Sequence, residues 1–354
     1  MIGQTVGHRS LRIPRLLRLT QGPESTVAAV RELVGADRSL LVVHRGDESP
    51  TSYGRGFAQM TRSAGLSATE CVVAANTDAW ARFVMRCIEE TSPDYVVGAG
   101  GGRVIDVAKV AASETGRDFI SVPTQAASDG ICSPVAVMVD ESGSPRSVGA
   151  RIPAAIVVDM QVLGQAPETT WLSGLGDLIS NLSAVRDWRF AHELYGEPLD
   201  DFACLTAEAA ALSVYTEAAR ISDPEYQERL IRGLILSGIA MEMAGSSRPA
   251  SGPEHLVSHA LDRLLSEPRQ HGLQVALATV TMHLLRGSEV ARLIRFYRAV
   301  GLPVHPRDLE IEVPLYMEAI RRGPEQRPGR RTILDRLDDR DFGRLARIYD
   351  RGDL

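Results

Sequence analysis

The chain has 354 residues and a formal net charge of −6, and its 44% hydrophobic and 24% charged residues are typical of a globular protein large enough for two domains. No apolar run reaches the ~18 residues of a membrane helix, no dense basic block indicates nucleic-acid binding, and the start lacks the apolar core of a secretory signal. Four cysteines without CxxC spacing indicate reduced thiols, so we expect a cytoplasmic protein with neither a membrane nor a nucleic-acid partner.

The first half of the chain alternates short apolar runs with helical patterns. The runs lie at residues 40–44, 71–75, 95–100, 119–123, 135–139 and 154–159, and the helical patterns at residues 25–34, 53–64, 77–90 and 105–113. The runs lack polar alternation, so both faces of each strand should be buried, as in a parallel sheet. This alternation predicts an α/β layer. The last two runs have little helix between them and could form a hairpin.

The second half is predicted to be helical, because no convincing strand follows residue 166 or so. Its clearest helix can be capped by Ser222 or Asp223, has Pro224 in its first turn and ends at Gly245. Further helices are expected at about 199–220, 255–266, 271–286 and 288–300. The fold class is therefore α/β, with a Rossmann-like nucleotide domain over residues 1–165 and an all-helical domain over residues 166–354.

A glycine-rich stretch, "VVGAGGGRVIDVAK", spans residues 96–109. A strand that runs into glycines and then a helix can bind phosphate, because backbone N–H groups point at the anion and no Cβ blocks its approach. Gly98 and Gly100 fit the G-x-G-x-x-G fingerprint, but Arg103 takes the third glycine position. A tight strand-to-helix turn without a ligand is the alternative.

Two charged residues follow these glycines. Asp106 is expected in the first turn of the helix, where it either caps the positive end of the helix dipole or contacts a ligand. Lys109, the chain's only lysine, lies one turn further on and reads by itself as a solvated helix-surface residue.

The candidate metal ligands lie in the second half. His255 and His259 are spaced i, i+4 and share one helix face, and His271 follows sixteen residues after His255. Asp177 in "SGLGDLISN" supplies a carboxylate. Two imidazoles and one carboxylate can hold a divalent ion with an open position, which would lower the pKa of a substrate hydroxyl. The alternatives are two polar surface histidines and an Asp177 that caps a helix at residue 178.

Four sequence blocks match one family in their order and separation. They are "GAGGGRVIDVAK", "FISVPTQAASDGICSP", "SGLGDLISNLSAVRDW", and "SGPEHLVSHALD" followed by "HG". The chain thereby resembles the sn-glycerol-1-phosphate dehydrogenases, within the wider group of iron-type alcohol dehydrogenases, glycerol dehydrogenases and dehydroquinate synthases, over roughly residues 30–300. The resemblance implies a dehydroquinate synthase-like fold with the active site between the two domains. It also implies metal-dependent, NAD- or NADP-linked reduction of dihydroxyacetone phosphate to sn-glycerol 1-phosphate.

The resemblance also assigns roles to residues. Asp177, His255 and His271 would bind the metal, usually zinc, and Asp129 and His259 would contact the substrate, giving Asp129, Asp177 and His259 as the catalytic set. The residues expected to contact the cofactor lie on the glycine loop and after the next two strands: Gly100, Gly101, Gly102, Arg103, Val104, Ile105, Asp106, Thr124 and Ser133. The expected partners are a small substrate, a phosphorylated triose, and further copies of the chain.

The chain departs from the family pattern beside the expected site. The family's T-A-A-S-H-D-G reads T-Q-A-A-S-D-G over residues 124–130, so Ser128 replaces a histidine and Ala127 a serine, and Leu273 replaces a glutamate two residues after His271. Another polyol or keto substrate and a non-catalytic relative therefore stay open. A sugar-phosphate cyclase would need several lysines and a glutamate on the metal.

The choice between NAD and NADP also stays open. Arg45, at the end of the first clear strand, could accept a 2′-phosphate, whereas Asp47 could hold a ribose 2′-hydroxyl.

Overall fold

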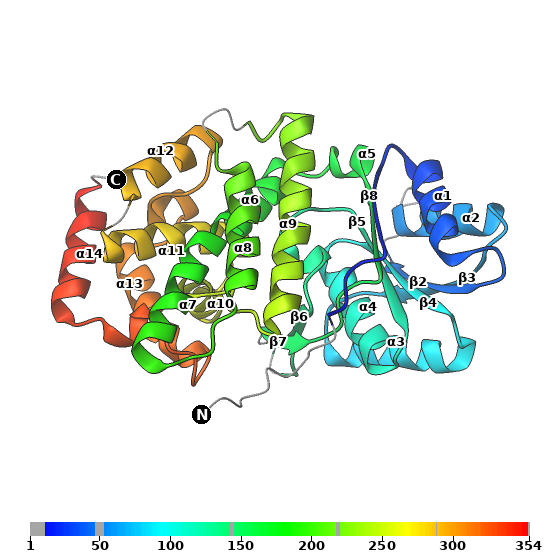
Figure 1. Ribbon diagram of the computed structural model, residues 1–354, viewed down its shortest axis with the longest axis horizontal. Helices are drawn as coiled ribbons and strands as arrows, with labels where there is room; N and C mark the ends of the chain where they lie inside the picture. Colours follow the sequence, from blue (N-terminus) through cyan, green and yellow to red (C-terminus); the bar gives the residue numbers. More distant parts are fainter. Residues whose placement is uncertain are drawn as a thin grey trace, which may run out of the picture.

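The computed structural model describes residues 11–46, 53–141, 143, 145–216, 220–287 and 289–352. A parallel sheet with its helices forms one end of the molecule and a cluster of helices forms the other, with the long helix α9 between them (Figure 1). The elements of the first half are β1 (Leu16–Thr20), α1 (Pro23–Val34), β2 (Ser39–Arg45), α2 (Tyr53–Ser63), β3 (Ser67–Val73), α3 (Asp78–Thr91), β4 (Tyr95–Gly100), α4 (Gly102–Glu114), β5 (Asp118–Pro123), the 3-10 turn η1 (Asp129–Ile131), β6 (Val135–Val139), β7 (Pro145–Gly149) and β8 (Ala155–Asp159).

The second half contains only helices among its described residues. They are α5 (Met160–Leu163), α6 (Glu168–Ile179), α7 (Asn181–Tyr195), α8 (Asp201–Val214), α9 (Pro224–Ala244), α10 (Pro253–Leu264), α11 (His271–Arg286), α12 (Val290–Val300), α13 (Val313–Arg322) and α14 (Asp339–Arg351), with short 3-10 turns between the last of them. The prediction of an α/β half followed by a helical half is confirmed. Helix α9 begins after Asp223, which accepts a hydrogen bond from Glu225 N, and ends at Gly245 in the left-handed conformation, as predicted.

The six-stranded sheet places the glycine loop at a ligand-binding position. Its order is β1-β8-β5-β4-β2-β3, and all pairs are parallel. The chain moves outward from β2 to β3 and then returns to place β4 on the other side of β2. Ligands of open α/β sheets bind where the strand order reverses in this way, at the carboxyl ends of the strands. Strand β4 ends at Gly100, directly at that point.

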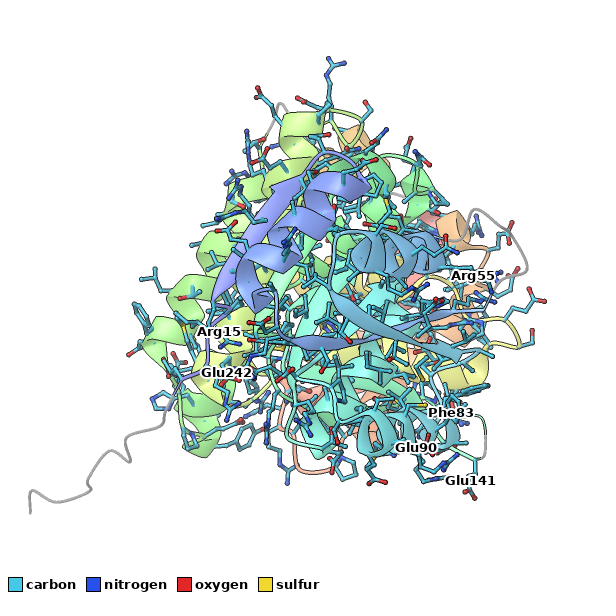
Figure 2. All side chains as sticks on the ribbon, turned by 90° about the vertical axis from the view of Figure 1, so that its right-hand side faces the viewer. Arg15, Arg55, Phe83, Glu90, Glu141 and Glu242 are labelled. Atoms are coloured by element: carbon cyan, nitrogen blue, oxygen red, sulfur yellow. The ribbon has the colours of Figure 1, made fainter. Side chains whose placement is uncertain are left out.

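Helices cover both faces of the sheet because successive strand residues alternate between them. In β2, Leu40 and Val42 pack with α1 and α2, whereas Leu41 and Val43 pack with α3 and α4. Figure 2 views this half end on, with Arg55 of α2 on one side of the sheet and Phe83 of α3 on the other. The continuous apolar runs of the sequence reflect this double burial.

Two expectations about the strands were wrong. The run at residues 135–139 does form a hairpin, but its partner is β7 and not the run at 154–159, which joins the main sheet as β8 between β5 and β1. β7 escaped detection because "PRSVG" is mostly exposed and carries no apolar run. Strand β1 was also missed, because "LLRLT" lies at the sheet edge, where an exposed Arg18 interrupts the apolar pattern.

Lys109 is not a solvated surface residue. Its side chain is 1% exposed, and its Nζ donates hydrogen bonds to the backbone oxygens of Gly130 (2.7 Å) and Val135 (2.8 Å) and lies 3.7 Å from Asp106 Oδ1. Burial lowers the pKa of Lys109, and Asp106 opposes that change. The only lysine of the chain therefore ties helix α4 to the segment that leads from η1 into β6.

Lys109 should resist amine-reactive acylation in the folded protein and react once urea unfolds the chain, because its amine is buried and occupied by two carbonyls. Peptide mapping by mass spectrometry after acylation under both conditions measures this. Rapid labelling of Lys109 in the native protein would contradict its buried position.

Glycines in α6 bring the two halves of the molecule into backbone contact. A Cβ on Gly174 would lie 2.0 Å from the backbone oxygen of Ala126, and a Cβ on Gly176 would lie 2.3 Å from that of Gly272 in α11. Both separations are far below any real contact, so only glycine allows these approaches. The "SGLGD" motif therefore presses α6 against the loop after β5 on one side and against α11 on the other.

We expect Gly174→Ala to destabilise the protein by about 3 kcal/mol, because the new methyl group meets backbone that cannot move aside easily. Chemical denaturation measures the change in unfolding free energy. Gly56→Ala in α2 is the matched control, since nothing lies within 4 Å of its new Cβ, and the exchange should be neutral or stabilising. Equal effects of the two variants would show that the Gly174 contact is unimportant.

Candidate active site

Asp177, His255 and His271 come together between three helices, α6, α10 and α11. One ligand atom from each lies within 4.8 Å of the others. Asp177 Oδ1 lies 3.3 Å from His255 Nε2 and 3.8 Å from His271 Nε2. Asp177 and His255 are buried, and His271 is partly exposed, which leaves the cluster open on one side. The alternative, that Asp177 caps a helix at residue 178, is wrong, because Asp177 lies inside α6.

Both imidazoles turn Nε2 inward because other groups engage Nδ1. Glu254 Oε1 lies 3.1 Å from His255 Nδ1, and Ser258 Oγ lies 3.2 Å from His271 Nδ1. Glu254 is fully buried and also accepts a hydrogen bond from Gly252 N at 2.6 Å, so it is fixed in place. Carboxylate and hydroxyl partners of this kind fix the tautomer and orientation of metal-binding histidines.

The electrostatics of the cluster follow from its burial. Burial alone would lower the pKa of His255, but its hydrogen bonds to Asp177 and Glu254 outweigh that effect and raise the pKa to about 9. Burial and the neighbouring charge of His255 lower the pKa of His271 to about 4. Asp177 and Glu254 therefore favour a positive charge beside His255, which a bound divalent cation would supply.

The three side chains fit a divalent metal. In tetrahedral coordination with bonds of roughly 2.0–2.1 Å, ligand atoms stand about 3.3 Å apart, close to the 3.3 Å and 3.8 Å found here. The set of two nitrogens and one oxygen leaves one coordination position for a substrate oxygen. His259, Asp262 and His271 form a second group, but it is less buried and shares His271 with the first.

Asp129 reaches the site from the other half of the molecule. It lies in η1, in the loop after β5, and its backbone N–H donates to Asp177 Oδ2 at 2.9 Å. Its own carboxylate accepts a hydrogen bond from Ser237 Oγ of α9 at 2.9 Å. Burial, and then the charge of Asp177, raises the pKa of Asp129 to about 7. Asp129 is thus a partly buried acid beside the cluster.

His259 lies at the open side of the cluster. Its ring stacks on that of His271, with centroids 5.8 Å apart, and its side chain is 30% exposed. Asp262 Oδ2 lies 3.8 Å from His259 Nδ1, and Asp262 Oδ1 accepts a hydrogen bond from Gln274 Nε2 at 2.8 Å. The same Gln274 amide donates to Ser258 Oγ at 3.0 Å. A polar chain therefore links His259 to Ser258, the partner of His271.

The glycine loop is open on the side where a pyrophosphate would lie. Gly101 precedes α4 without any side-chain cap, and the space around a Cβ on Gly102 is empty. Arg103 is exposed, whereas Val104 and Ile105 are buried and anchor the helix. Thr124 N donates to the backbone oxygen of Gly100 at 3.0 Å, which places the end of β5 beside the loop.

Two expected cofactor contacts are engaged elsewhere. Asp106 lies beyond the first turn of α4, because the helix begins at Gly102. Burial raises its pKa to about 6, and Lys109 opposes that change. Ser133 is buried, and its hydroxyl donates to the backbone oxygen of Val135 at 3.0 Å. These two side chains stabilise the wall of the site.

Three of the residues that depart from the family pattern, Gln125, Ser128 and Leu273, have different surroundings. Gln125 Oε1 would lie 3.2 Å from a Cβ on Gly101, so this side chain lies against the glycine loop. Ser128 caps η1 by accepting a hydrogen bond from Gly130 N at 3.2 Å. Leu273 packs into the hydrophobic core of the helical half. Only Gln125 changes the surface beside the expected cofactor site.

Sequence reasoning missed the groups that support the site: Ser237, Glu254, Ser258, Asp262 and Gln274. Some signals were present. Glu254 directly precedes His255, and Ser237 interrupts the apolar face of α9. Their roles depend on contacts between different helices, which spacing along the chain does not predict.

The fold and the site define a class. A doubly wound sheet with an open glycine loop faces a two-histidine, one-carboxylate cluster in a helical half. A model of the iron-containing alcohol dehydrogenase family matches residues 23–167. The structure of a probable glycerol dehydrogenase from Sinorhizobium meliloti 1021 superimposes with a TM-score of 0.72 at 24% identity, covering 97% of this chain and 98% of that one. The sheet half is therefore similar to the iron-containing alcohol dehydrogenases, and the fold of the chain is that of the glycerol dehydrogenases.

Sequence relatives define the family within that class. The chain is 36% identical over 326 residues to the NAD(P)+ glycerol-1-phosphate dehydrogenase of Thermococcus kodakarensis, with 92% of each chain covered. It is 36% identical over 330 residues to the enzyme of the same name from Hyperthermus butylicus, covering 92% of this chain and 93% of that one. The chain belongs to the glycerol-1-phosphate dehydrogenase family. Within its described residues, no helix has the length and hydrophobicity needed to cross a bilayer.

We expect Glu254→Gln to weaken zinc binding by about 10- to 100-fold, because the variant removes the charged partner that orients His255 and makes it more basic. Competition with a chromophoric chelator measures the affinity. Glu193→Gln changes an exposed acid on α7 in the same way and should leave the affinity unchanged. Unaltered zinc affinity in Glu254→Gln would show that Glu254 does not support the ligand set.

Proposed function

We propose that this protein reduces dihydroxyacetone phosphate to sn-glycerol 1-phosphate with NADH or NADPH and a zinc ion. The observation that supports the proposal is the Asp177–His255–His271 cluster. The loop after β5 contacts both Asp177, through Asp129 N, and the end of β4, through Thr124 N. Relatives that match 92% of the chain bear the name glycerol-1-phosphate dehydrogenase, which supports this substrate class.

Asp177, His255 and His271 would hold the ion. A zinc ion held there would act as a Lewis acid on the substrate carbonyl. Asp129, with a pKa near 7 and a fixed hydrogen bond to Ser237, holds a neighbouring hydroxyl and fixes the substrate for hydride transfer. His259 is partly exposed and lies next to His271, so it passes a proton between the substrate oxygen and solvent.

The cofactor would lie across the switch point of the sheet. Gly100–Gly102 and the start of α4 offer backbone N–H groups to the pyrophosphate, and Gln125 adds a side-chain amide beside Gly101. Arg45 is exposed at the end of β2, while Asp47 lies outside the described residues. We therefore propose both NAD and NADP as cofactors.

The alternatives have less support. A sugar-phosphate cyclase needs several active-site lysines, and the one lysine here is buried and bonded to two backbone carbonyls. A non-catalytic relative would have no reason to keep three clustered ligand residues with their supporting groups. Another polyol or keto substrate is the second candidate, because Gln125 and Ser128 change the loop beside the site.

A homo-oligomer and a cytoplasmic location stay predictions.

The test is oxidation of NADH and NADPH by the zinc-loaded protein with dihydroxyacetone phosphate, with chiral analysis of the product. Asp177→Asn and His271→Ala should each lower turnover by about a thousandfold, because the bound metal supplies several kcal/mol of charge stabilisation. His192→Ala on α7, which removes an exposed histidine, is the matched control and should retain full activity.

A product of the sn-1 configuration identifies the reaction. No turnover with metal and cofactor bound would contradict this substrate, and other polyols and keto compounds would then be tested with variants of residues 125–128.

A further inference from the structure

A basic groove lies between α12 and α14, the two helices at the end of the molecule opposite the sheet (Figure 1). Its volume is about 600 Å³, within the range of small-molecule sites. Five arginines line it, and we call it the arginine groove: Arg295, Arg298, Arg344, Arg347 and Arg351. All its other lining residues are aliphatic, and no acidic residue lines it. This concentration of positive charge lies on a chain with a net charge of −6.

The three arginines that α14 contributes to the groove lie on one face of that helix. Arg344, Arg347 and Arg351 follow one another at i, i+3 and i+7 along α14, whose opposite face buries Leu345 and Tyr349. Like charges at such spacings destabilise a helix slightly. The pattern therefore costs some stability.

Most of these guanidinium groups have no partner within the described residues. Arg344 lies 3.9 Å from Asp341 and donates to the backbone oxygen of Leu285, but Arg295, Arg298, Arg347 and Arg351 make no side-chain hydrogen bond or ion pair there. Some arginines elsewhere in the helical half differ, since Arg189 and Arg286 pair with acids at 2.5–2.7 Å. Asp350 is exposed on α14 but does not line the groove.

The groove also has an apolar floor. It consists of Leu284, Val290, Ala291, Ile294 and Ile348, which line the groove together with the arginines, and Ile294 is buried. Arg298 also lines a second hollow of about 640 Å³, where Leu302 and Leu309 add aliphatic surface and Arg307 adds a further guanidinium. The two hollows therefore adjoin at Arg298.

We propose that the arginine groove binds a single anionic amphiphile, with a phosphate head group on the guanidinium rim and a hydrocarbon tail on the aliphatic floor. Guanidinium groups bind phosphate oxygens through paired, charge-assisted hydrogen bonds. The aliphatic floor removes a short hydrocarbon chain from water. An inorganic anion would pair with the guanidinium groups but leave the aliphatic floor exposed to water. A neutral apolar ligand would cover the floor but leave the guanidinium groups unpaired.

The probe is dihexanoyl phosphatidic acid below its micelle concentration, titrated calorimetrically into the full-length, zinc-loaded protein. We expect saturable binding that is at least tenfold tighter than binding of inorganic phosphate and of dihexanoyl phosphatidylcholine, which has the same tails on a head group without net charge. Arg347→Gln/Arg351→Gln should weaken this binding at least tenfold. Arg82→Gln/Arg86→Gln on α3 removes the same charge from exposed arginines in the other half and should have no effect.

A second variant tests the floor. Ile348→Asn should weaken binding of the amphiphile and leave binding of inorganic phosphate unchanged. All these variants should keep the metal content and reductase activity of the parent protein, because none of the changed residues lies in the candidate active site. The experiment therefore tests the arginine groove independently of the proposed function.

Several outcomes would overturn the proposal. One is equal affinity for inorganic phosphate and the amphiphile. Another is binding that survives Arg347→Gln/Arg351→Gln, as binding in the active site would. Adsorption only to vesicles that contain phosphatidic acid, without binding of the monomer, would mean that the groove meets a bilayer surface and not one molecule. Stronger binding of an oligonucleotide than of the amphiphile would assign the arginines to nucleic acid.

Discussion

The carboxylate of Asp177 joins the two halves of this protein. Its Oδ1 faces the imidazole nitrogens of His255 and His271, and its Oδ2 accepts the backbone N–H of Asp129 from the loop after β5. One buried group therefore fixes the two histidines relative to the edge of the sheet where β4 ends. Hydride transfer needs the reacting atoms to be held within a narrow range of distance and orientation. The connection through Asp177 keeps the two halves in the fixed relative position that this requires.

Backbone contact makes this geometry possible. Gly174 and Gly176 let α6 approach the loop and α11 more closely than any other residue would. Ser173 reinforces the same contacts, since its hydroxyl donates to the backbone oxygen of Ala127 at 2.9 Å and accepts from Gly272 N at 3.1 Å. The position of Asp177 is thus set by rigid backbone on both sides and does not depend on a flexible side chain.

A second layer of buried charge lies behind the cluster. Asp187 of α7 accepts hydrogen bonds from Arg286 Nη2 at 2.7 Å and from Ile333 N at 3.0 Å, and Arg248 Nη1 lies 3.5 Å away. Burial raises the pKa of Asp187 to about 6, and Arg286 opposes that rise. Buried ion pairs contribute little net stability. Their effect here is to tie α7, α11 and the C-terminal segment around the helix that carries His255.

The sequence by itself determined the strand–helix alternation, the glycine loop, the helical second half and the identity of the clustered residues Asp177, His255 and His271. These features depend on local periodicity, on turn chemistry and on residue types with few chemical uses, all of which can be read along the chain. The sequence did not determine the partner of β6, the edge strand β1, the burial of Lys109, or the support that Glu254, Ser258 and Ser237 give the site. Only the tertiary structure decided these, because each depends on which distant segments share a buried environment, where an unpaired polar group is costly and its partner is chosen by packing.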